Sequence, residues 1–109
     1  MITWSDFEKI DIRAGTILEV NDFPNARKPS YQLTIDFGEL GIKRSSAQIT
    51  NLYEKEELIS RQVIAVVNFP SKQIANFFSE CLVLGVYNEN NDVVLLQPSL
   101  KVQNGGRIG

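Results

Sequence analysis

Two polar stretches of the chain carry the side chains best suited to bind a ligand. The first is IKRSSAQIT at 42–50, in which two cations precede hydroxyl and amide groups that can bond phosphates, amides or carbonyls. For any one of these residues, a purely structural role has equal support, in which the serines only cap the turn that follows. The ligand-binding candidates from this stretch are Lys43, Arg44, Ser46 and Gln48.

The second stretch, NFPSKQIANFFSE at 68–80, places three phenylalanines in a segment that otherwise has the composition of a loop. Proteins that bind single nucleic-acid strands combine a basic groove with aromatic platforms, whereas Phe69 and Phe77 could instead fill a core. Consecutive side chains of an extended segment point to opposite faces, so Phe77 and Phe78 cannot both point inward. The candidates from these residues are Asn68, Lys72, Ile74, Phe77 and Phe78.

The chain lacks the side chains that most catalytic and metal sites need. It has no histidine, which excludes Ser-His-Asp catalysis, Cys-His catalysis and imidazole ligation of a metal. The single cysteine, Cys81, excludes an internal disulfide and cysteine-based zinc or iron–sulfur sites, and its place before an apolar run predicts a buried, unreactive thiol. No Gly-rich phosphate-binding loop is present. We therefore expect a protein that is not an enzyme and needs no metal or cofactor.

Length and composition indicate one globular domain over residues 1–109, because 43% hydrophobic and 22% charged residues are ordinary values for a folded domain. The net charge of −2 gives no general attraction to nucleic acid. The opening sequence MITWSDFEKI is charged early and does not resemble a signal peptide. The longest apolar runs, such as VIAVV at 63–67, are too short to span a membrane. We expect a cytoplasmic protein that does not insert into membranes.

The elements that must position the two polar stretches are mostly strands. Apolar residues alternate over 12–20, which predicts a strand, and Gly15 within it predicts a bulge or bend that helps a sheet curl into a barrel. Further strands are expected at 31–38, 41–49, 62–69, 81–87 and 92–98, the last two as a hairpin over Asn88–Asn91, with a short strand in the terminal segment.

Helical signals are short and few. Ser5-Asp6-Phe7-Glu8 has the form of a capping box and predicts a short N-terminal helix, and a helical turn is expected at 54–60. This order of elements indicates an all-β protein with short helices, namely a five-stranded OB-fold β-barrel with an N-terminal helix and extra terminal strands.

Apolar residues at both ends of so short a chain need cover. They could pack on their own barrel, or they could form the contact between two copies of the chain. The candidates for a dimer interface are Trp4, Phe7, Val102 and Ile108.

Several spaced motifs resemble those of a known family. DIRAGTI at 11–17, PNARK at 24–28, SAQI at 46–49, NFP at 68–70 and SE at 79–80 are similar to the tRNA-binding domain, an OB-fold module found alone or attached to some aminoacyl-tRNA synthetases. The pattern K-x-S-S-A-Q-I-T, followed by V-N-F-P and S-E-x-L-V-L-G, is similar to that of the CsaA-like export chaperones within this family. The resemblance covers nearly the whole chain.

The resemblance implies a homodimer that binds peptides or unfolded precursor proteins and assists their export, with the export machinery and tRNA as further partners. It also implies that Asn68, Lys72 and Ser79 face the ligand. The alternative that it leaves open is a stand-alone tRNA-binding module that recognises the shape of folded tRNA.

The chain departs from the wider tRNA-binding pattern within the second stretch. Where that pattern runs Lys-Ile-x-Gly-x-x-Ser-x-Gly-Met, this chain has Gln-Ile-Ala-Asn-Phe-Phe-Ser-Glu-Cys-Leu at 73–82. Positions 73 and 75 carry no basic side chain, and Phe78 adds apolar surface. Because these changes weaken phosphate attraction, they favour a peptide ligand over tRNA.

Overall fold

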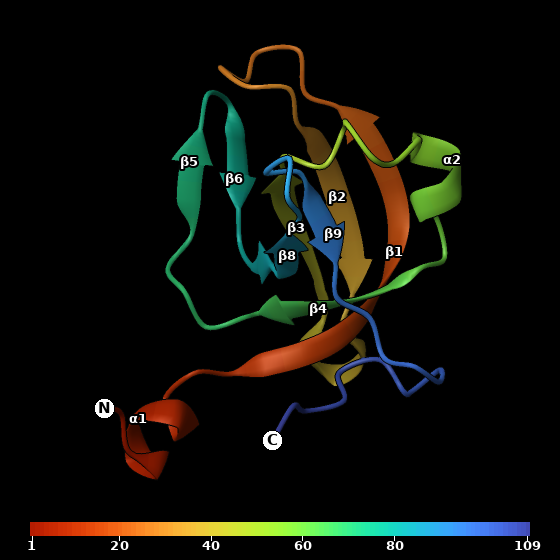
Figure 1. The fold of residues 1–109 in the computed structure, drawn as a ribbon. Coiled ribbons are helices and arrows are strands. Elements are labelled where there is room, and N and C mark those ends of the chain that lie inside the picture. Colours follow the sequence, from red (N-terminus) through yellow and green to blue (C-terminus); the bar gives the residue numbers. More distant parts are fainter.

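Five strands form one antiparallel sheet that curls into a nearly closed barrel in the computed structural model, which describes all of residues 1–109 (Figure 1). The sheet order is β3-β2-β1-β4-β7. This architecture confirms the all-β, five-stranded barrel expected from the sequence. The strands are β1 (Ile12–Asp22), β2 (Tyr31–Asp36), β3 (Ile42–Ala47), β4 (Gln62–Val66) and β7 (Leu82–Val83).

Two short hairpins and three short helices complete the fold. The hairpin of β8 (Gly85–Tyr87) and β9 (Val93–Leu95) confirms the turn expected at 88–91. The segment 68–80 is not simply a loop, because β5 (Lys72–Ile74) and β6 (Phe77–Ser79) pair across a turn in which Ala75 has a φ of 54°. The helices are α1 (Trp4–Glu8), the 3₁₀-helix η1 (Gly38–Leu40) and α2 (Lys55–Leu58). None of them is long and apolar enough to cross a membrane.

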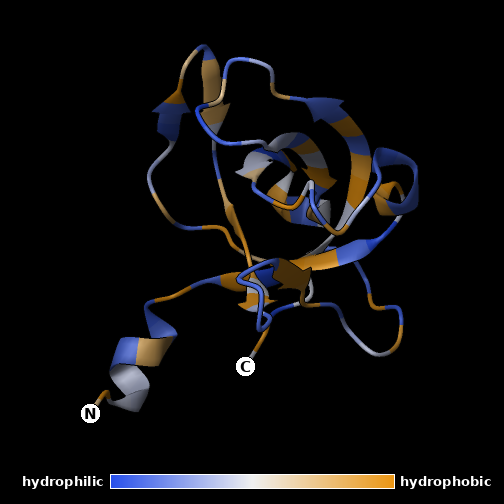
Figure 2. Cartoon of the chain, turned by 45° about the horizontal axis from the view of Figure 1, so that its top comes forward, coloured by the Kyte–Doolittle hydropathy of each residue, from blue (hydrophilic) through white to orange (hydrophobic).

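The core forms because apolar and polar side chains alternate along the strands, so that one face of the curled sheet is apolar. In β2, for example, Leu33 and Ile35 are fully buried and alternate with half-buried Gln32 and Thr34. Figure 2 shows this alternation as bands of contrasting colour along the strands. Hydrophobic burial of this kind provides the main favourable free energy of folding.

The two long edges of the sheet meet where β3 approaches residues 79–81. The Glu80 N–H donates to the carbonyl oxygen of Arg44 at 2.8 Å, and the Ser45 hydroxyl donates to the carbonyl oxygen of Cys81 at 3.0 Å. Ser45 and Cys81 are both buried. These contacts close the barrel at this end only, since β3 and β7 share no ladder of backbone hydrogen bonds.

Two local predictions need correction. The capping box of α1 is formed by Thr3 and Asp6, not by Ser5 and Glu8, because Thr3 accepts from the Asp6 N–H at 3.2 Å and Asp6 accepts from the Thr3 N–H at 3.0 Å. The expected terminal strand is reduced to a single bridge between Arg13 and Arg107.

Gly15 is needed for close packing and not for a bulge. Its pairing with Val63 is regular, and the bulge of β1 falls between Ile17 and Glu19. A Cβ atom added at Gly15 would lie 2.7 Å from Ile35 Cγ2 and equally close to the Phe37 ring. The small residue at this position therefore allows Phe37 to lie fully buried against β1.

We predict that Gly15→Ala lowers the free energy of unfolding by about 1–3 kcal/mol, because the added methyl group overpacks the core. Urea unfolding measures the change. Gly109→Ala is the matched control, since nothing lies within 4 Å of a Cβ there and its stability should be unchanged. Equal stabilities of the two variants would contradict this account of Gly15.

Candidate functional site

A pocket of about 540 Å³ opens where β3 and β7 separate beyond the contacts that close the barrel. One wall is the end of β3 and the turn after it, at 46–52, and the other is the segment 82–85 with Tyr87. The hairpin β8–β9 contributes Val93 and Leu95, and Lys28 and Pro29 lie at the rim. The pocket is thus a gap in the barrel wall, bordered by two strand edges.

The walls of this pocket combine apolar surface with hydrogen-bonding groups. Half of its eighteen lining residues are hydrophobic, among them Leu52 and Leu82, which are both exposed. The Asn51 side-chain amide donates to the Asp92 carboxylate at 2.9 Å, which ties the turn after β3 to the β8–β9 hairpin. A ligand with apolar side chains and a polar backbone matches such a lining.

Of the ten residues predicted to bind a ligand, only Ser46 and Gln48 line this pocket. Lys43 and Arg44 lie earlier on β3. The Arg44 guanidinium carbon lies 4.4 Å from the centroid of the Phe77 ring, and its Nη2 donates to Gln32 at 3.4 Å. Arg44 therefore covers a core phenylalanine while part of its side chain remains exposed.

The three phenylalanines of the segment 68–80 have different environments. Phe77 is buried and packs on Phe23, with ring centroids 5.3 Å apart, so it anchors the β5–β6 hairpin and presents no ring to a ligand. Phe78 is 54% exposed, which confirms that one of the two consecutive rings faces outward. Phe69 is 56% exposed, and the alternative that it fills the core is wrong.

Ser79, Lys72 and Ile74 lie together on the β5–β6 hairpin. The Ser79 Oγ accepts from the Ser46 N–H at 3.3 Å and donates to the Cys81 carbonyl at 3.3 Å, so its hydroxyl fastens β6 beside the pocket. Lys72 pairs with Ser79 in register and is exposed, whereas Ile74 is half-buried. Burial raises the pKa of the Cys81 thiol to about 11, which keeps it protonated and unreactive at neutral pH.

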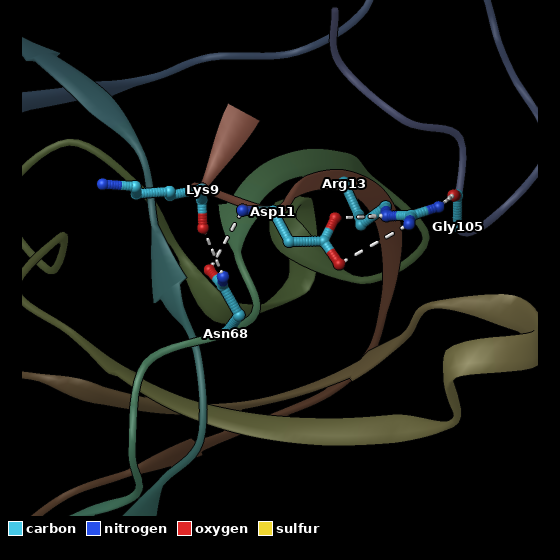
Figure 3. A network of polar contacts seen from close by, with 5 residues as sticks. All are labelled: Lys9, Asp11, Arg13, Asn68 and Gly105. Atoms are coloured by element: carbon cyan, nitrogen blue, oxygen red, sulfur yellow. Dashed lines mark hydrogen bonds and ion pairs between the residues drawn. The ribbon is translucent and has the colours of Figure 1, made fainter. Parts of the chain in front are cut away.

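Asn68 is placed away from the pocket, at the junction between α1 and β1 (Figure 3). Its side chain accepts from the Asp11 N–H at 3.0 Å and donates to the Lys9 carbonyl at 2.7 Å. Asp11 in turn pairs with Arg13, which donates to the Gly105 carbonyl at 3.0 Å. The amide of Asn68 thus holds the segment that carries α1, and both of its polar groups are already used.

The residues predicted for a dimer interface fall into two groups. Trp4 is 81% exposed on α1, no residue of which is buried, and it lines an apolar hollow with Phe7 and Gly109. Ile108 directly precedes Gly109 in the sequence, and its N–H donates to the Ile12 carbonyl at 2.9 Å. Val102 is instead held to β4 by backbone bonds to the Gln62 side chain.

The pocket residues from the turn after β3 and from the β8–β9 hairpin were not anticipated from the sequence. Leu52, Tyr87 and Asp92 stand in runs that read as turns or ordinary strands, and no motif marks them. A usable signal was the pair of polar turns at 50–54 and 88–92 that flank apolar strands, since binding residues are found disproportionately on such connecting segments.

Comparison with known proteins agrees with this architecture. A family model described as "Putative tRNA binding domain" matches residues 12–107. The crystal structure of the chaperone CsaA from Bacillus anthracis superimposes with a TM-score of 0.95 at 52% identity, covering 100% of this chain and 99% of that one. The CsaA chaperone from Picrophilus torridus gives a TM-score of 0.94 at 57% identity, with both chains covered completely. These similarities confirm the OB-fold barrel expected from the sequence.

Longer proteins also contain a similar segment. The methionine–tRNA ligase of Pyrococcus abyssi is 33% identical over 107 residues, which is 98% of this chain but 14% of the ligase. The chain therefore spans about a seventh of the curated relatives that it matches. The family model covers residues 12–107, which include all the strands of the barrel and, apart from Asp11, the sequence motifs. The chain therefore belongs to the family of putative tRNA-binding domains.

Proposed function

We propose that the protein is a non-enzymatic homodimeric chaperone that binds peptides and unfolded precursor proteins in the cytoplasm and assists their export. The observation that carries this proposal is the pocket of about 540 Å³ in the barrel wall, whose lining is half hydrophobic. Its size is that of a small-ligand or side-chain pocket, and its position between strand edges leaves it accessible to a chain. The structural similarity to two CsaA chaperones supports the same reading.

The charge distribution near the pocket favours a polypeptide over a nucleic acid. Lys28 is the only cation that lines the pocket, and Asp92 is the only carboxylate in the lining. Phe69 and Phe78 add exposed aromatic surface on the neighbouring segment. The single cysteine, which forms no disulfide, suits a reducing cytoplasm.

The second candidate function is binding of folded tRNA, which the family match favours. In that case the cations of β3 and β5, namely Lys43, Arg44 and Lys72, would contact phosphates, since Arg44 and Lys72 are exposed and Lys43 is partly exposed. Export machinery as a partner belongs to the first proposal, because only a client-bound chaperone would need to deliver its client.

We predict that an unfolded precursor polypeptide binds with an affinity that changes little between low and high salt, because apolar burial depends weakly on ionic strength. Binding of tRNA should instead weaken steeply, since release of counterions dominates it. Fluorescence titrations of both labelled ligands at two salt concentrations separate the proposals. Tight tRNA binding together with no polypeptide binding would overturn the chaperone proposal.

We predict that Phe78→Ser weakens polypeptide binding by roughly fivefold, which corresponds to losing about 1 kcal/mol of apolar contact from a half-exposed ring. The melting temperature should hardly change, because the ring contributes little to the core. The control is Phe77→Ser, which should lower the free energy of unfolding by roughly 3–5 kcal/mol. Unchanged binding by Phe78→Ser would remove this ring from the ligand surface.

Helix α1 supports the dimer proposal, because it projects from the barrel and buries none of its residues within the chain (Figure 1). Trp4 and Phe7 line the apolar hollow beside Gly109, which a second copy could cover. Asn68 holds the junction at Lys9 and Asp11, so the direction in which α1 projects is set by the barrel.

We predict that the protein sediments as a dimer at tens of micromolar and that Trp4→Asp sediments as a monomer with an unchanged melting temperature. A charge on α1 would oppose burial against a second copy, whereas it costs the isolated chain nothing. Thr50→Asp, which adds the same charge in the pocket wall at 46–52 and outside the hollow beside α1, serves as the charge control. A wild-type protein that sediments as a clean monomer contradicts the interface.

A further inference from the structure

The segment 82–87 comprises β7, Leu84 and β8, and its paired backbone groups lie on a single edge. The Leu84 N–H donates to the Ile64 carbonyl at 2.8 Å, and the Leu84 carbonyl accepts from the Leu96 N–H at 3.2 Å. The N–H and C=O groups of one strand residue point to the same edge. Strand β4 and the β9 segment therefore lie along the same edge of 82–87.

The register of these pairs decides where the other backbone groups point. In an antiparallel ladder, pairs that exchange hydrogen bonds alternate with pairs that do not. Leu84 is in a bonded pair, and the Asn88 N–H donates to the Asp92 carbonyl at 2.9 Å, so the bonded positions are even-numbered. The N–H and C=O groups of Val83, Gly85 and Tyr87 therefore point to the opposite edge.

This opposite edge faces the pocket. The Cys81 carbonyl, two residues before Val83, accepts from Ser45 on β3 and belongs to the same edge. Beyond that contact the two walls separate, and Val83, Gly85 and Tyr87 all line the pocket between them. The chain supplies no strand here, because β7 is the last strand of its sheet and β8 pairs only with β9.

The facing wall offers backbone groups of the same kind. Even-numbered residues of β3 turn their N–H groups away from β2, as shown by Arg44, which donates to Glu80 Oε1 at 3.1 Å, and Ser46, which donates to Ser79. Gln48 follows two residues later, beyond the end of β3, and its N–H makes no hydrogen bond within the chain.

We propose that an extended polypeptide segment binds in this pocket as an added strand and pairs its backbone with Val83, Gly85 and Tyr87. The inference rests on the proposed function and states how the client is held. Free groups on alternate residues recur at about 6.6–6.8 Å, the repeat of a β-strand. The backbone groups within a helix already bond one another, so a bound helix could not pair with this edge. The phosphates of RNA only accept hydrogen bonds, so they could not satisfy the carbonyl groups that alternate with N–H groups along the edge.

Backbone pairing with an added strand also suits a chaperone that binds clients of different sequence. Hydrogen bonds to the backbone are available from almost any residue of a client. Alternate side chains of the added strand would enter the apolar lining around Leu52 and Leu95, which prefers clients with apolar residues at every second position. Proline at a pairing position would remove a donor and should be disfavoured.

The test is amide hydrogen exchange measured by NMR on the full-length protein. The probe is a capped octapeptide of alternating leucine and threonine with a lysine at each end. At a peptide concentration ten times the dissociation constant, exchange of the amides of Val83, Gly85 and Tyr87 should slow about tenfold. The amides of Leu84 and Val86, already paired with β4 and β9, should change little.

Two N-methylated forms of the octapeptide supply the matched comparison. Methyl groups on the alternate amides that face the β7–β8 edge should abolish binding, and methyl groups on the other alternate amides should leave it nearly unchanged. If both methylated peptides bound equally well, or if the peptide slowed exchange at odd- and even-numbered residues of 82–87 alike, the edge pairing would be overturned. Either result would leave the proposal of polypeptide binding intact. If an unfolded polypeptide binds and the octapeptide does not, the edge pairing fails; if neither binds, the proposed function fails with it.

Discussion

Closure of the barrel between β3 and residues 79–81 is the constraint on which the rest of the structure depends. The buried hydroxyl of Ser45 bonds the Cys81 carbonyl, and Arg44 and Glu80 exchange backbone and side-chain bonds beside it. Hydrogen bonds buried from water are costly to break, because the groups left behind would be unpaired. Since these bonds stop at Cys81, the walls separate beyond it, and the barrel ends in an open pocket and not in a sealed core.

The segment 68–80 serves both the scaffold and the surface. Asn68 holds the junction that carries α1, Phe77 anchors the β5–β6 hairpin in the core, and the Ser79 hydroxyl fastens that hairpin to β3. Several residues that a family motif associates with the ligand are thus already engaged in internal bonds. Of these residues only Ser79 bonds a residue of the pocket wall, Ser46, while Phe69 and Phe78 remain exposed.

A pocket bordered by unpaired strand edges suits a binding protein whose clients share a backbone but no sequence. Charge contributes little selectivity there, because one cation and one carboxylate share the lining. Apolar surface and backbone groups can act together, since the first excludes water and the second sets the direction of the bound chain.

The sequence by itself determined where the main strands lie along the chain, the barrel class, the buried thiol and the opposed environments of Phe77 and Phe78, because these follow from the alternation and composition of side chains along each strand. Among its ligand-binding candidates were Ser46 and Gln48, which line the pocket. It could not show the β5–β6 hairpin, the use of Asn68 at the α1 junction or the pocket wall at 82–87. Those features depend on which distant segments meet when the sheet curls, and only the tertiary structure decides where the two edges of the barrel touch and where they part.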